Sequence, residues 1–203
     1  MKVIFGGTFD PIHVGHLCMA NALAESLSVK EVSLMPCYDA VHKQSVGASS
    51  DHRLNMLVLA IKSDTLLTVD ERECSRGEAS YTINSLLELR DELGDEPLCL
   101  VVGTDAANGL PAWLKAKEFF KLTHVVVISR PEVQGVALCQ ETIAEKLELL
   151  GFSLAVSLNE LKEVSVGRFV FIDLPPLDIS STYIRNRIKQ GLSIRYLVTD
   201  AVR

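Results

Sequence analysis

The stretch that decides the fold is Gly6-Gly7-Thr8-Phe9-Asp10-Pro11-Ile12-His13-Val14-Gly15-His16, which joins the apolar run 3–5 to a segment with helical periodicity. Adjacent glycines let the backbone approach an anion closely, and a helix start adds free N–H groups and partial positive charge. His13 and His16 lie three residues apart, so both imidazoles can donate to phosphate oxygens and gain charge beside them. The stretch therefore predicts a phosphate-binding strand–loop–helix unit rather than a plain turn with two surface histidines.

Outward from this stretch, short apolar runs alternate with segments of 3.6-residue periodicity, which is typical of βα units on a parallel sheet. We expect strands at 3–5, 31–35, 66–69, 98–102, 124–128 and 169–172, and helices at 14–27, 51–63, 82–93, 114–120, 141–150 and 182–190. The pattern predicts an α/β fold with a doubly wound, Rossmann-like, mainly parallel sheet and helices on both faces. We expect one domain over 1–203, with a peripheral excursion at 131–168.

Composition limits the classes of partner. The net charge of −6 argues against broad binding of nucleic acid or acidic lipid. No charged-then-apolar leader precedes the first strand, and no apolar stretch approaches the ~18–20 residues that span a bilayer. The five cysteines form no C-x-x-C pair, as expected for reduced packing residues. We therefore expect a cytoplasmic protein with neither nucleic-acid nor membrane partners.

A second phosphate-binding motif lies near the carboxyl end, at Ile179–Arg185. The hydroxyls of Ser180, Ser181 and Thr182 and the backbone amides at a helix start form an anion cup, and Arg185 follows one turn later. We expect Ser181 to be the N-cap of this helix and Gly191 to end it. Two such cups in one chain fit a single ATP molecule held between them.

Both motifs resemble those of the adenylyl- and cytidylyltransferase superfamily, T/H-x-G-H and I-S-S-T-x-[IV]-R. The longer form G-G-T-F-D-P-I-H-x-G-H resembles the bacterial nicotinate-nucleotide adenylyltransferase branch, whose members convert ATP and nicotinate mononucleotide into deamido-NAD and pyrophosphate with Mg²⁺. The resemblance implies that His13 and His16 contact the α- and β-phosphates and that Thr182 and Arg185 contact the β- and γ-phosphates. It implies an ATP site that also includes Gly6, Gly7, Thr8, Phe9, Ser180 and Ser181.

Further matches to this branch concern the adenosine and the mononucleotide. Gly103 and Asp105 resemble its G-x-D at a strand end, where the glycine admits adenosine and the aspartate accepts ribose hydroxyls. The segment 76–82 resembles R-x-G-x-S-Y-T, and the tryptophan of L-x-x-W stacks on the nicotinate ring. The mononucleotide contacts that the resemblance implies are Tyr81, Thr82, Trp113, Arg130 and Lys43.

One departure affects the last of these contacts. The branch usually carries P-x-x-x-P-P-H-K, and here Ala40 and Val41 replace the two prolines before His42 and Lys43. The loop therefore lacks the two prolines that stiffen it in the branch. Lys43 could equally be a solvated loop lysine.

The expected chemistry needs no protein base, because the attacking phosphate is largely dianionic at pH 7. No carboxylate cage is visible, so we expect Mg²⁺ to be carried by ATP oxygens and water rather than by protein side chains. Three alternatives stay open: nicotinamide mononucleotide or phosphopantetheine as the acceptor, and a non-catalytic nucleotide sensor. The oligomeric state, including a possible homo-oligomer, also stays open.

Overall fold

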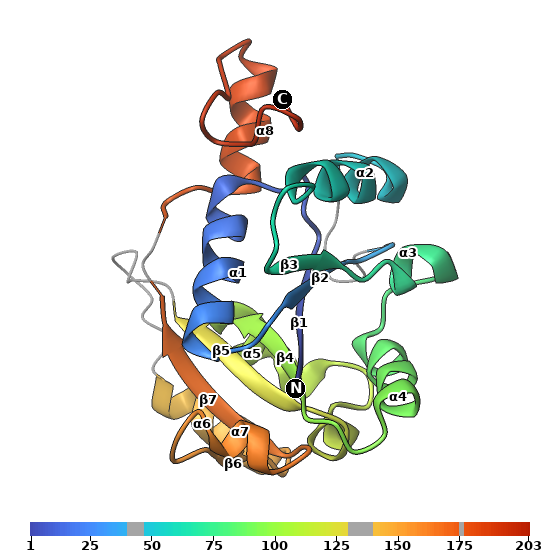
Figure 1. Ribbon diagram of the computed structural model, residues 1–203, viewed down its shortest axis with the longest axis vertical. Coiled ribbons are helices and arrows are strands. Elements are labelled where there is room, and N and C mark those ends of the chain that lie inside the picture. The colour runs from blue at the N-terminus through green and yellow to red at the C-terminus, as the bar shows by residue number, and fades with distance from the viewer. Residues whose placement is uncertain (40–46, 130–139, 175–176) are drawn as a thin grey trace. The chain divides into compact units, whose positions relative to one another are not determined.

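The computed structural model describes residues 1–39, 47–129, 140–174 and 177–203 (Figure 1). Its strands form a sheet in the order β3-β2-β1-β4-β5-β7-β6, and all the pairings with a known register are parallel. The strand order runs outward from β1 in one direction and resumes at β4 in the other, which is the doubly wound arrangement. The predicted fold class is confirmed. The strands are β1 (Lys2–Gly7), β2 (Val32–Pro36), β3 (Leu67–Val69), β4 (Leu98–Gly103), β5 (His124–Ser129), β6 (Ser153–Leu154) and β7 (Arg168–Asp173).

The chain divides into two compact units. The first comprises Met1–Phe5 and Tyr81–Leu174. Its helical elements are α4 (Thr82–Leu93), α5 (Thr104–Gly109), α6 (Gln140–Leu149), α7 (Glu160–Glu163) and the 3₁₀ helices η1 (Leu110–Ala112) and η2 (Ala116–Lys121). The single domain expected over 1–203 stays a prediction.

The core of the first unit is built on β4 and β5. Val125, Val126 and Val127 are fully buried, as a strand covered on both faces requires. Cys99 is also fully buried on β4, and burial raises the pKa of its thiol to about 12. Its expected role as a packing residue agrees with this burial.

The second unit comprises Gly6–Ser80 and Pro175–Arg203. It contains α1 (Val14–Ser26), α2 (Ser50–Ala60), α3 (Arg72–Arg76) and α8 (Ser181–Lys189) together with β2 and β3. Every residue of β2 is buried, and α1 buries Ala20, Leu23 and Ala24 on one stripe. Both predicted phosphate motifs belong to this unit.

Several short elements differ from the expectation. The helix expected at 114–120 is the 3₁₀ helix η2, which begins at residue 116 after Lys115 adopts φ 55°. The N-cap of α8 is Ser180, not Ser181, because the Ser180 hydroxyl accepts the Tyr183 N–H at 3.1 Å. Gly191 follows α8 with φ 67°, as a glycine that ends a helix should. The elements α3, α5, α7 and β6 were not expected, since each is too short to show periodicity.

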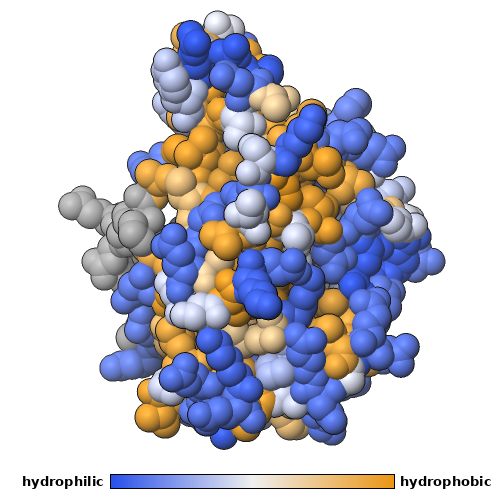
Figure 2. All heavy atoms as spheres, viewed as in Figure 1, coloured by the Kyte–Doolittle hydropathy of each residue, from blue (hydrophilic) through white to orange (hydrophobic). Residues whose placement is uncertain are grey.

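The surface view in Figure 2 shows hydrophilic residues interspersed with hydrophobic ones. The most exposed large apolar side chains in the described ranges are Leu149, Val156 and Tyr196. Scattered apolar side chains are ordinary on a protein surface. Across the ranges that the structure describes, no helix combines the length and the apolar character needed to cross a bilayer.

Candidate active site

The two glycines at the end of β1 have different surroundings. A Cβ on Gly6 would meet no atom within 4 Å, so the space above it is open. A Cβ on Gly7 would lie 2.8 Å from Cζ of Phe9, whose buried ring covers this glycine. Phe9 itself has φ 49°, a left-handed conformation that turns the chain out of the strand. Gly6 therefore leaves room for a ligand, whereas Gly7 makes room for Phe9.

His13 is the N-cap of α1, and its side chain is buried. Its Nδ1 accepts the backbone N–H of His16 at 3.3 Å, so the Nε2 atom is the one that carries a proton and can donate. The two imidazoles stack with their centroids 3.7 Å apart, and the His16 ring meets Phe9 edge-on at 5.1 Å.

The start of α1 offers fewer amides than expected. The Val14 N–H donates to the Leu197 carbonyl at 2.9 Å, and the N–H groups of His16 and Leu17 donate to the His13 carbonyl. Gly15 lies under the His13 ring, since a Cβ there would be 3.1 Å from two ring atoms. The expectation of freely available amides at this helix start is therefore wrong for these residues, and the histidine rings form the better donors.

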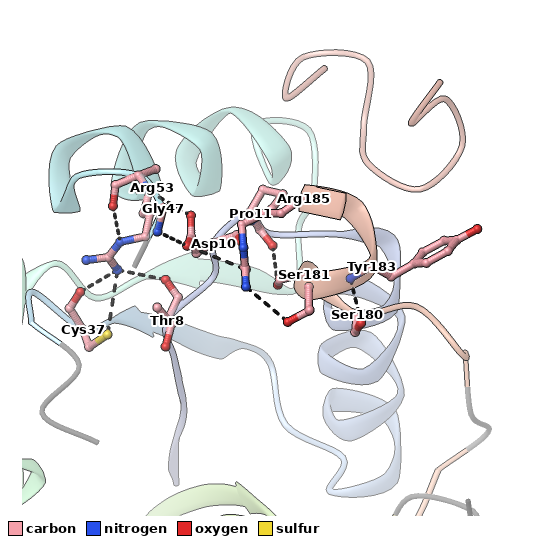
Figure 3. Close-up of polar contacts among 12 residues, drawn as sticks. Thr8, Asp10, Pro11, Cys37, Gly47, Arg53, Ser180, Ser181, Tyr183 and Arg185 are labelled. Carbon is pink, nitrogen blue, oxygen red and sulfur yellow. Dashed lines mark hydrogen bonds and ion pairs between the residues drawn. The ribbon is translucent and has the colours of Figure 1, made fainter. Parts of the chain in front are cut away.

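The two phosphate motifs contact each other directly (Figure 3). The Ser181 hydroxyl donates to the Pro11 carbonyl at 2.9 Å. Arg185 donates from Nη1 to the Asp10 carbonyl at 2.6 Å and from Nη2 to the Thr182 hydroxyl at 3.2 Å. Segments about 170 positions apart in the chain are thus joined by hydrogen bonds from a hydroxyl and a guanidinium to the backbone of the first motif.

Asp10 organises this cluster and was not predicted as a site residue. Its buried carboxylate accepts the N–H groups of Gly47 and Ala48 at 2.6 and 3.1 Å and lies 3.7 Å from Nη1 of Arg185. A Cβ on Gly47 would approach both Asp10 and Arg185 to 3.2 Å. The carboxylate therefore ties three segments of the second unit together.

Ser80 connects the segment after β2 with the end of the second unit. Its hydroxyl accepts the Tyr38 N–H at 2.8 Å, and its N–H donates to the Asp39 carbonyl at 3.2 Å. Lys43 lies outside the described residues, as do the substituted positions Ala40 and Val41.

In the first unit, the predicted residues occupy element ends. Gly103 is the last residue of β4 and the N-cap of α5, and Asp105 is exposed in the first turn of that helix. A Cβ on Gly103 would meet no atom within 4 Å.

The residues expected to contact the nicotinate ring also belong to the first unit. Trp113 follows η1, is half-buried, and meets the Phe119 ring edge-on at 6.2 Å. Tyr81 is the 39% exposed N-cap of α4, which Thr82 begins. Arg130 lies outside the described residues.

Metal-binding side chains do not cluster in the part of the chain that the structure describes. No group of three or more histidine, cysteine, aspartate or glutamate residues there could hold a metal ion. The buried Asp10 carboxylate is already engaged with amides and with Arg185.

Comparison with known proteins places the chain among nucleotidyltransferases. Residues 4–187 match the cytidylyltransferase-like family. The chain is 44% identical over 203 residues to a probable nicotinate-nucleotide adenylyltransferase of Marinobacter nauticus, covering 100% of this chain and 92% of the relative. It is 42% identical to a probable nicotinate-nucleotide adenylyltransferase of Hahella chejuensis, covering 98% of this chain and 90% of the relative.

The fold resembles that of a Plasmodium falciparum nicotinic acid mononucleotide adenylyltransferase solved in complex with NaAD. The TM-score is 0.70 at 20% identity, covering 96% of this chain and 87% of the other. This likeness supports the α/β architecture independently of close sequence similarity.

Proposed function

Since the chain belongs to the cytidylyltransferase-like family, we propose that it transfers the adenylyl group of ATP to nicotinate mononucleotide, giving deamido-NAD and pyrophosphate. The observation that carries this proposal is the direct contact between the two phosphate motifs, in which Arg185 donates to the Asp10 carbonyl. The curated relatives, which match over nearly the full chain, support the choice of substrates.

In the proposed reaction, an oxygen of the mononucleotide phosphate attacks the α-phosphorus of ATP. A new O–P bond forms, the bond from the α-phosphorus to the bridging oxygen breaks, and pyrophosphate leaves with that electron pair. The attacking phosphate has a second pKa near ~6 and needs no protein base at pH 7. The task of the protein is to hold two anions in line and to neutralise the developing charge.

We assign the charge-neutralising contacts to the second unit. The Nε2–H of His13 and the ring of His16 serve the α- and β-phosphates, while Thr182 and Arg185 serve the β- and γ-phosphates. The stacking of His13 on His16 and the hydrogen bond from Arg185 to Thr182 support this division into two pairs. The backbone of Gly6–Phe9, the hydroxyl of Ser180 and the backbone N–H of Ser181, whose own hydroxyl donates to the Pro11 carbonyl, complete the ATP contacts.

The other assignments follow the resemblance. Gly103 and Asp105 serve the adenosine, and the mononucleotide contacts are Lys43, Tyr81, Thr82, Trp113 and Arg130. The 39% exposure of Tyr81 and the half-exposed indole of Trp113 are compatible with these roles.

We propose that Mg²⁺ accompanies ATP, where it would neutralise charge on the polyphosphate. The donor set described above suits an ion carried by phosphate oxygens and water.

We also propose a cytoplasmic location, which the free thiols of Cys18, Cys74 and Cys99 support. Formation of a homo-oligomer is tested by measuring the mass of the protein in solution.

The test is turnover of ATP with nicotinate mononucleotide, nicotinamide mononucleotide or phosphopantetheine, followed by pyrophosphate release and by the mass of the product. We expect the nicotinate substrate to give the highest kcat/KM. A clear preference for another acceptor contradicts the substrate assignment, and ATP binding without pyrophosphate release favours the sensor.

Two arginines of α8 offer a matched pair for the same assay. Arg185→Met should lower kcat/KM by about 10²–10³-fold, because it removes a positive charge that stabilises the transition state. Arg187→Met should leave kcat/KM nearly unchanged, because Arg187 donates instead to the Ser193 carbonyl and the Tyr183 hydroxyl.

A further inference from the structure

Arg53 is an arginine inside the second unit, on the first turn of α2. Its side chain is only 1% exposed and is among the largest fully buried side chains in the described ranges. Arginine is almost never buried to this degree unless its charge and its donors are satisfied. The contacts that satisfy this buried cation are therefore expected to have a structural or functional role.

The guanidinium donates to backbone carbonyls of three separate segments (Figure 3). Nη1 donates to Thr8 at 2.8 Å and to Cys37 at 2.7 Å, Nη2 donates to Tyr38 at 2.7 Å, and Nε donates to Ala48 at 3.3 Å. Thr8 belongs to the first phosphate motif, and Cys37 and Tyr38 follow β2. One planar fork thus sets the separation between the phosphate motif and the end of the neighbouring strand.

The Arg53 guanidinium is also connected to the second phosphate motif, through the backbone of Ala48. Ala48 accepts from Arg53 and donates its own N–H to the Asp10 carboxylate, which faces Arg185. A chain of polar contacts therefore connects Arg53 with both ends of the proposed ATP clamp.

The charge of Arg53 has no carboxylate partner among the residues that the structure describes. Its acceptors there are the four carbonyls and, more weakly, the Cys37 sulfur at 3.8 Å. Carbonyl dipoles satisfy the N–H groups but leave the net positive charge in place. A buried cation of this kind is better compensated when a polyanion occupies the adjoining phosphate motif.

We propose that Arg53 is a positioning residue for adenylyl transfer, which holds the Thr8 carbonyl and the Cys37–Tyr38 carbonyls in register and so sets the phosphate motif for ATP. This inference rests on the proposed function. Arg53 acts through the backbone and touches neither substrate. Lysine cannot replace it, because a single ammonium group cannot reproduce the fork that spans the three segments.

The chain contains a matched control in Arg90 of α4. Among the described residues, its guanidinium likewise donates to backbone carbonyls alone, those of Gly94, Glu96 and Leu122, and none of these is a predicted site residue. Arg90→Met should therefore lower the melting temperature without changing the kinetics of the folded protein.

The experiment compares Arg53→Met, Arg53→Lys and Arg90→Met with the unmodified chain. The measurements are the melting temperature, kcat and KM for ATP and nicotinate mononucleotide, and the Kd of α,β-methylene-ATP by calorimetry. Both Arg53 variants should lose about 10²-fold or more in kcat, since displacement of a positioning element by about 1 Å has that effect. The Arg90 variant should keep kcat within about threefold.

Three results would overturn the proposal: an Arg53→Met enzyme with wild-type kcat, full rescue by lysine, or an equal kcat loss in Arg90→Met. If Arg53→Met does not purify in folded form, the lysine variant decides by the same criterion. If the unmodified chain shows no turnover, the proposed function fails separately. The Kd then decides the role of Arg53: at least about tenfold weaker binding in Arg53→Met supports it, and unchanged binding overturns it.

Discussion

Alanine substitutions at Gly6 and Gly7 separate the two uses of glycine in the phosphate motif. Both residues end β1, and neither has a positive φ, so backbone strain does not distinguish them. What differs is the space that a methyl group would enter. In Gly7→Ala it would enter the Phe9 ring, and in Gly6→Ala it would enter the open space that we assign to ATP.

The size of the Gly7→Ala effect follows from three distances. The new Cβ would lie 2.8, 2.9 and 3.1 Å from Cζ, Cε1 and Cε2 of Phe9, closer than carbon atoms pack. Phe9 is only 2% exposed and cannot move aside without disturbing its neighbours. Overpacking of this kind costs about 1–3 kcal/mol in the free energy of unfolding.

Gly6→Ala should instead leave stability intact and weaken the binding of ATP. The methyl group meets no protein atom and restricts the unfolded chain, so the free energy of unfolding should stay level or rise by up to about 1 kcal/mol. The same methyl group would obstruct the approach of a phosphate to the backbone. We expect KM for ATP to rise at least about tenfold, which corresponds to about 1.4 kcal/mol of binding free energy.

The assay pairs urea unfolding with steady-state kinetics at varied ATP concentration. The reasoning is refuted if Gly6→Ala keeps the wild-type KM and kcat, because the open space would then not be the path of the phosphate. It is equally refuted if Gly7→Ala unfolds at the wild-type urea concentration.

Two further predictions concern histidines. His16→Ala should lower kcat by about 10²–10³ while the protein stays folded, because one contact to the developing charge is lost; near-normal turnover would contradict the assignment. Burial lowers the pKa of His124, which accepts the Arg168 N–H through Nδ1 and donates from Nε2 to the Val164 carbonyl. Its unfolded form takes up a proton at a higher pH than its folded form, so this contribution to stability is complete above the ordinary histidine pKa and is lost as the pH falls below it. Between pH 7.5 and 5.5, urea unfolding should show stability falling by up to about 1.4 kcal/mol per pH unit, and His124→Gln should remove that part of the slope; an unchanged slope in the variant would assign it to other groups.

The sequence predicted the fold to within a few residues wherever an element is long and apolar. The helix expected at 82–93 is α4, Thr82–Leu93, and the strand expected at 98–102 extends by one residue as β4. Such elements are specified by side chains that recur along one short stretch, and these can be read without their partners. The helices α3 and α7, with 5 and 4 residues, carry too few turns to show a period.

The candidate site, like the fold, has one part that the sequence predicted and one part that it did not. The two phosphate motifs can be recognised from the sequence because their glycine, histidine and hydroxyl residues lie close together in the chain. Asp10 lies within the first motif, but the motif alone predicts no role for it, because its partners Gly47 and Ala48 come nearly 40 positions later. The roles of the site residues stay predictions that the kinetic experiments test.

By itself, the sequence determined the doubly wound α/β fold, the family and the position of the two motifs that we expect to bind phosphate. Only the tertiary structure decided three hydrogen bonds. The Val14 N–H donates to the Leu197 carbonyl, the Ser181 hydroxyl donates to the Pro11 carbonyl instead of capping its helix, and Arg53 donates to the Thr8 carbonyl. The physical reason is the range of the interactions. Helix and strand propensities act over a few neighbouring residues, whereas a buried donor finds its acceptor only after distant segments have packed together.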